Sequence, residues 1–130
     1  MKKILLLTSL FMLALSSLCF AAEPYAGQNK VLFYSNDDEV AYVVTDTIKF
    51  TSDTTCDYVV VTNESNIKNN VAHVEEFFTL ADNKLTCSKA NCYDTDWNLL
   101  YTVTVDSFTP TNLSADEFAQ TLKVFRKLKG

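Results

Sequence analysis

Apolar and polar residues alternate along most of the chain after residue 30, and this pattern predicts β-strands joined by polar links. The alternation is strictest over residues 99–105, where every second side chain is large and apolar. The run CDYVVVT at residues 56–62 is short and rich in β-branched residues, which also favours a strand. The expected strands are residues 31–35, 40–50, 56–62, 71–80, 84–93 and 99–105.

The alternation also predicts which side chains share a face of each strand. In residues 40–50 it places Val40, Tyr42, Val44, Ile48 and Phe50 on one face, with a bend near Thr45 and Asp46. In residues 71–80 one face is apolar but is interrupted by Glu76. Clusters of Asn, Asp, Ser and Thr predict links at residues 51–55, 63–70, 81–83 and 94–98.

The period changes only near the C-terminus, where residues 114–128 read as a helix. Ser114 and Glu117 have the S-x-x-E spacing of a capping box, which marks a helix start. Phe118, Leu122 and Phe125 then recur at helical spacing and form one apolar stripe. An isolated helix of this length is marginal in water, so we expect the stripe to pack on the sheet.

These elements predict an α+β, mainly β fold in a single domain over residues 31–130. The links between the strands are too short for the crossovers that parallel strands require. We therefore expect an antiparallel meander of about six short strands with one C-terminal helix packed on one face.

The first residues have the pattern of a secretory signal peptide. A short basic start precedes an apolar run at residues 4–18, and small residues follow it, which predicts a signal peptide of residues 1–21 and a flexible leader of residues 22–30. A retained membrane anchor is disfavoured because the run is short for a spanning helix. Lipid attachment at Cys19 is the other alternative, although Leu18 is large for the position before a lipidated cysteine. We expect export to the periplasm or cell surface and no spanning segment in the mature chain.

Export changes the charge and the cysteine count. Loss of Lys2 and Lys3 lowers the net charge by two, from −5 to −7, and this acidity argues against nucleic acid as a partner. The remaining cysteines allow one disulfide and one free thiol, either between Cys87 and Cys92 around a small loop or between Cys56 and one of them. A zinc site formed by these cysteines and His73 matches no familiar zinc spacing.

No group of residues predicts catalysis, a metal or another cofactor. His73 is the only histidine and has no nucleophile in a recognisable setting. Asp94, Asp96 and Asn98 alternate like the start of a calcium loop, but Leu99 and Val105 stand where such a loop needs Gly and Glu. A β-turn explains these residues better.

Two features are candidates for contact with a partner. Trp97 lies in an expected turn, where an aromatic side chain either folds back on the core or serves as a binding anchor. Lys123, Arg126 and Lys127 crowd the end of the helix. They either complement the helix dipole or form a basic patch for an acidic partner.

The second half of the chain resembles the surface-adhesin protein E family of small exported bacterial proteins. The resemblance rests on Tyr93-Asp94, Asp96-Trp97-Asn98, the strand at 99–105, the link at 108–110 and the helix at 114–125, with an earlier match at 42–49. The usual turn glycine is missing at 96–98. The resemblance implies an antiparallel meander with a helix across it and a surface or envelope role, which in the best-known member is adhesion to host matrix proteins.

The sequence therefore predicts an exported, non-enzymatic binding protein that contacts a protein partner through loop tips such as Trp97 or through a sheet edge. The alternative is a periplasmic inhibitor or immunity-type protein whose acidic surface meets a basic enzyme.

Overall fold

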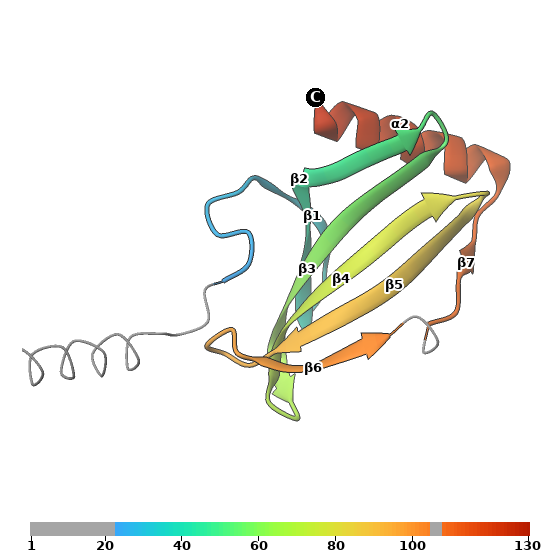
Figure 1. Cartoon of the computed structure of the whole chain (residues 1–130). Coiled ribbons are helices and arrows are strands. Elements are labelled where there is room, and N and C mark those ends of the chain that lie inside the picture. The colour runs from blue at the N-terminus through green and yellow to red at the C-terminus, as the bar shows by residue number, and fades with distance from the viewer. Residues whose placement is uncertain (1–22, 105–107) are drawn as a thin grey trace, which may run out of the picture.

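The fold is one antiparallel sheet crossed on one face by a helix (Figure 1). A computed structural model describes residues 23–104 and 108–130. The strands are β1 (Lys30–Ser35), β2 (Glu39–Ser52), β3 (Thr55–Lys68), β4 (Val71–Ala81), β5 (Lys84–Tyr93), β6 (Leu99–Thr104) and β7 (Thr111–Asn112), and the helix is α2 (Ala115–Lys129). Strands β1 to β6 pair in chain order, and β7 pairs with the start of β5. The expected α+β, mainly β meander is confirmed.

The predicted link at residues 63–70 is wrong, because β3 continues to Lys68 and only Asn69 and Asn70 form the turn. Both asparagines are left-handed, with φ of 54° and 64°. Asparagine tolerates this conformation, which two-residue hairpin turns require. Asp82 and Asn83 form the same kind of turn between β4 and β5, where a link was expected.

The predicted alternation along the second strand is also wrong, because β2 contains a bulge of three extra residues. Val44 pairs with Val59 but Lys49 pairs with Asp57, so five steps along β2 match two along β3. The Thr47 hydroxyl fills the gap in the ladder: it donates to the Val44 carbonyl at 2.6 Å and accepts from the Val59 N–H at 2.9 Å. The three extra residues reverse which face the side chains occupy.

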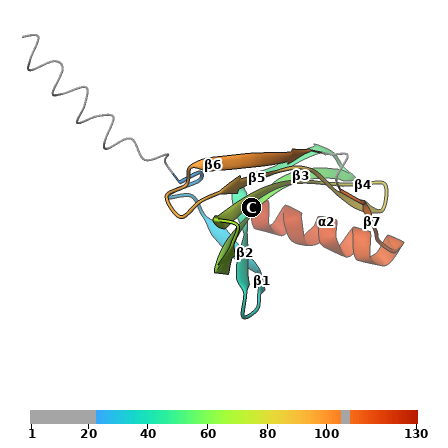
Figure 2. The ribbon, with the colours of Figure 1, turned by 90° about the horizontal axis from the view of Figure 1, so that it is seen from below.

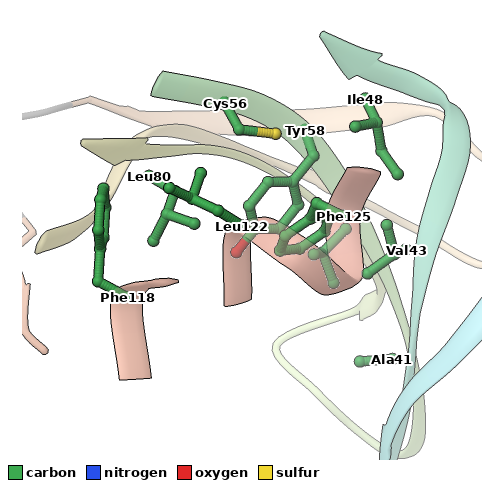
Figure 3. Packing of buried hydrophobic residues seen from close by; sticks show 10 residues of the cluster. Ala41, Val43, Ile48, Cys56, Tyr58, Leu80, Phe118, Leu122 and Phe125 are labelled. Atoms are coloured by element: carbon green, nitrogen blue, oxygen red, sulfur yellow. The ribbon is translucent and has the colours of Figure 1, made fainter. Parts of the chain in front are cut away.

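The sheet has a cluster of buried side chains on each face. The helix face, which α2 covers in part, carries the larger one, made of Ala41, Val43, Ile48, Cys56, Tyr58, Val60, Leu80, Phe118, Leu122 and Phe125 (Figure 3). The opposite face carries Val44, Val59 and Val61, with Tyr25, Phe77 and Trp97 packed around them.

The helix begins at the expected capping box. The Ser114 hydroxyl accepts from the Glu117 N–H at 3.1 Å, and the Glu117 carboxylate accepts from the Ser114 N–H at 3.2 Å. The predicted stripe is confirmed: Phe118, Leu122 and Phe125 are 8 %, 5 % and 3 % exposed, and the Phe125 ring stacks on Tyr58 at 4.2 Å.

Both ends of the helix are tied to hairpin turns. At its start the Leu113 N–H donates to the Asn83 carbonyl at 2.8 Å, which holds the chain at the turn between β4 and β5. Near its end the Arg126 guanidinium donates to the carbonyl of Asp53, in the turn between β2 and β3. The helix therefore lies across one end of the sheet, beside the tips of these two hairpins (Figure 1).

The helix is too small to cover the face on which it lies. Strands β2 and β3 have 14 residues each and span roughly 46 Å. The 15 residues of α2 make a rod about 22 Å long and 10 Å wide. Strand β1 and the adjoining part of β2 bend toward the side of α2, so the uncovered part of the helix face lies in a concave sheet (Figure 2).

The segment expected to be a flexible leader makes defined contacts where it is described. Two turns, closed by Ala26 N–H to Glu23 carbonyl and Gln28 N–H to Tyr25 carbonyl bonds, place Tyr25 on the apolar cluster of the opposite face. The predicted signal peptide, Cys19 and Val105 lie outside the described residues. Within the described ranges, no helix has the length and apolar character needed to cross a membrane.

Packing of the stripe predicts a stability test. Leu122→Ala or Phe118→Ala should lower the free energy of unfolding by roughly 2–5 kcal/mol, because each leaves a cavity under the helix. Val124→Ala on the same helix is the control, since Val124 is 54 % exposed and should cost less than about 0.5 kcal/mol. Urea denaturation followed by circular dichroism measures all three, and equal stabilities would contradict the packing.

Candidate functional site

The uncovered part of the helix face forms a groove of about 350 Å³. This volume lies at the small end of the range for ligand sites. We call it the acidic groove; its lining residues are Phe33, Tyr34, Glu39, Ala41, Val60, Thr62, Glu64, Val74, Glu76, Phe78, Ala90, Val103 and Phe108.

The register of the strands explains why the face is hollow here. One row across the sheet pairs Val60 with Glu76, Glu76 with Ala90 and Ala90 with Val103. The next row toward the helix pairs Tyr58 with Phe78, and the Tyr58 ring fills that space against Phe125. Ala90 and the two valines of the first row are smaller than Tyr58 and Phe78 of the next row. The surface of the sheet is therefore recessed beside the helix.

Glu76 lies on the floor of the acidic groove. It is half-buried between apolar neighbours, and within residues 23–104 and 108–130 no lysine or arginine forms an ion pair with it. Burial raises the pKa of its carboxyl, and the negative charge of Glu39 raises it further. A carboxylate in such a setting is costly unless something pairs with it.

Glu39 and Glu64 form a second acidic feature at the outer end of the groove. They lie directly opposite each other on β2 and β3, where like charges repel. The pKa of Glu64 is raised, first by burial and then by Glu39. The groove thus collects negative charge from three strands.

Aromatic and apolar side chains form the rims of the groove. Phe33 and Tyr34 of the edge strand β1 are 57 % and 48 % exposed, and Val103 and Phe108 line the other side. At the second sheet edge Leu99 and Tyr101 of β6 are 56 % and 50 % exposed. Exposed apolar side chains beside a groove are typical of a surface that binds a partner.

The sequence pattern reveals only part of this site. Glu76 was visible as the one polar residue on the apolar face of its strand, and the structure places it on that face as expected. The pattern places Glu64 in the predicted link at 63–70 and leaves Glu39 just before the predicted strand at 40–50, whereas β3 continues to Lys68 and β2 begins at Glu39. Only the cross-strand register brings the three glutamates to one groove.

Trp97 folds back on the sheet instead of projecting from its turn. Its ring stacks on His73 with a centroid distance of 3.8 Å and lies 5.4 Å from the Tyr93 ring. It also packs against the valine cluster of the opposite face. The pKa of His73 is lowered, chiefly because the ring is partly removed from water. Trp97 therefore lies on the other face from the acidic groove.

The Asp94 carboxylate stabilises the turn that carries Trp97. Asp94 accepts hydrogen bonds from the Asp96 and Asn98 N–H groups, both at 2.9 Å, which is the geometry of an Asx turn. These bonds, that of Asn98 first, lower the pKa of Asp94. Among the described residues, no group of three or more His, Cys, Asp or Glu side chains is arranged to hold a metal ion.

Glu75, the neighbour of Glu76, lies on the opposite face and is hydrogen-bonded. It is 5 % exposed and accepts hydrogen bonds from the Tyr93 hydroxyl at 2.8 Å and the Asn91 amide at 2.9 Å. Burial, followed by the bond to Glu75, raises the pKa of Tyr93 to about 12. Glu75 therefore has a structural environment that Glu76 lacks.

The basic residues at the end of α2 are exposed, and two of them lie beside the Phe50 ring. Arg126 lies 5.2 Å from the Phe50 ring and donates to the Asp53 carbonyl. Lys129 lies 6.0 Å from the same ring, whereas Lys123 and Lys127 are exposed on the helix. These basic residues lie on α2 beside Phe50, whereas Trp97 packs on the opposite face of the sheet. The two predicted contact features therefore do not form one site.

The three described cysteines are free thiols in the structure, so the expected disulfide is not formed. Cys87 and Cys92 lie on the single strand β5, and no small loop separates them. Five residues of strand span roughly 16 Å, far beyond the 7 Å limit between bridged Cα atoms. Cys56 is on β3, and β4 lies between it and the other two.

Comparisons with protein-family models, with curated proteins and with solved structures find no match. The resemblance to the surface-adhesin protein E family therefore stays a prediction from the sequence motifs.

Adjacent glutamates on opposite faces give a matched pair for a stability test. Glu76→Gln should raise the free energy of unfolding by about 1 kcal/mol at neutral pH, because it removes an unpaired, half-buried charge. Glu75→Gln should lower it by about 1 kcal/mol, because it weakens two charge-assisted hydrogen bonds.

The gain from Glu76→Gln should depend on pH. Because the pKa of Glu76 is raised in the folded protein, the wild-type chain loses stability as pH rises from the ordinary value of 4.5 through the folded pKa. The difference between the variant and the wild type should therefore be largest above the folded pKa of Glu76 and disappear below about 4.5. Thermal melts across this range measure it, and a constant difference would contradict the unpaired state of Glu76.

Proposed function

We propose that the protein is an exported, non-enzymatic binding module that receives a protein partner in the acidic groove. The single observation that carries this proposal is the open, partly apolar groove beside α2, whose floor holds a carboxylate that no lysine or arginine of residues 23–104 and 108–130 pairs with. Export is the part of the proposal that rests on the signal-peptide pattern of the first residues.

The surroundings of the groove support a protein partner. Exposed apolar residues of β1 continue the apolar rim away from the groove, with Leu32 at 58 % and Phe33 at 57 % exposure. A small ligand would use the groove alone, whereas a protein surface would cover the groove and this strand together. The partner would therefore meet β1 and the groove side of the sheet.

Two roles share this binding mode. An adhesin-like protein would bind host matrix or envelope proteins, as the resemblance to the surface-adhesin protein E family implies. A periplasmic inhibitor or immunity-type protein would bind a bacterial enzyme, and the acidic groove favours a partner with a basic surface.

A groove-filling variant tests the proposal. Ala90→Phe places a ring on the groove floor, while Thr104→Phe places the same ring on an exposed site of the opposite face, since Thr104 pairs with Lys89. The wild-type chain from residue 23 and both variants are immobilised and exposed to bacterial envelope extract and to purified host matrix proteins. Bound proteins are quantified by mass spectrometry.

The wild type and Thr104→Phe should retain the same partner, and Ala90→Phe should lose it. Recovery of a bacterial enzyme would favour the inhibitor role, and recovery of a matrix protein the adhesin role. Equal recovery by Ala90→Phe and the wild type would overturn the groove as the binding surface.

A further inference from the structure

The acidic groove also indicates the chemistry of the group that enters it. We propose that the groove binds an arginine side chain of the partner, with the guanidinium between Glu76 and Glu39 and the apolar stem along the floor. This inference rests on the proposed function, because it names the recognition chemistry of the same site.

The groove has an apolar lining that a few carboxylates interrupt. Most of its lining is apolar, including Val60, Val74 and Ala90 on the floor and Phe78 beside the helix. The carboxylates enter only from β2, β3 and β4. A ligand that matches such a surface is itself mixed, with an apolar stem and one cationic end.

The carboxylates of Glu76 and Glu39 repel each other. Each negative charge acts on the other across the groove, because Glu39 contributes to the raised pKa of Glu76. No lysine or arginine among the described residues forms an ion pair with Glu76, and the apolar floor limits the access of water to its carboxylate. A cation between the two carboxylates would remove both the repulsion and the cost of desolvation.

The spacing of the carboxylates favours a guanidinium over a metal ion. The three glutamates line one groove but are not grouped closely enough to coordinate a metal. A guanidinium is wider, because it carries five donors in a planar fork and can meet two separated carboxylates. It also stacks on aromatic rings, and Phe33, Tyr34 and Phe108 form the rims of the groove.

The experiment uses short peptides as probes. Acetyl-Leu-Arg-Leu-amide is titrated into the isotope-labelled chain from residue 23, and amide chemical shifts are followed by NMR. Acetyl-Leu-citrulline-Leu-amide has nearly the same shape without the charge and is the ligand control. Calcium chloride at matched ionic strength is the metal control.

We expect the arginine peptide to shift the amides of Val60, Glu76 and Ala90 saturably, and the citrulline peptide and calcium to leave them unchanged. Glu76→Gln should weaken binding of the arginine peptide roughly tenfold, as loss of a charge-assisted contact predicts. Asp82→Asn removes one negative charge at an exposed turn whose φ of 53° asparagine also adopts, and it should bind like the wild type.

Three outcomes would overturn the inference: equal binding of the citrulline peptide, equal binding by Glu76→Gln, or shifts spread over the acidic surface without saturation. Saturable calcium binding at the same amides would replace the guanidinium with a metal ion and overturn it as well. If Ala90→Phe abolishes partner capture while the arginine peptide fails to bind, the groove remains the partner site and only its assigned chemistry is wrong.

Discussion

The structure depends on the packing of one helical stripe against one end of a long sheet. Phe118, Leu122 and Phe125 bury their side chains over Tyr58 and Leu80, and no other described helix contributes to this face (Figure 3). Burial of three such side chains can contribute roughly 1.5–3 kcal/mol each, which is a large share of the stability of a small domain. The same geometry leaves the rest of the face open, because a helix is narrower than these strands are long.

In the open part of the face, the positions of individual charges indicate a function that the net charge does not. A net charge of −5 over the full sequence indicates solubility more than function. On the groove floor, however, Glu76 is half-buried and forms no ion pair with any lysine or arginine that the structure describes, whereas Glu75 beside it in the sequence is buried and hydrogen-bonded. Alternation along β4 sends these two identical side chains to opposite faces. Their contrast separates a structural carboxylate from a candidate binding carboxylate.

Local sequence patterns predict most of the helix and strands. They do not predict the features that depend on how distant strands pair. The capping box and the stripe of α2 are local, so the sequence located them. The bulge in β2 depends on Thr47 bonding to both β2 and β3, which the alternation of β2 cannot reveal. The groove likewise joins Glu39, Glu64 and Glu76 through register. The cysteine prediction failed because Cys87 and Cys92 lie too far apart along the single strand β5, and β4 separates both from Cys56 on β3.

The most direct test of the account is a measurement of which methyl groups on the helix face meet solvent. NMR with a soluble gadolinium chelate should broaden the methyl signals of Val74 and Val103, which line the groove, and spare those of Ile48 and Leu80, which are 4 % and 0 % exposed. This result would establish a face that is covered at one end and open at the other. Equal protection of all four would contradict the account, because the groove would then be closed.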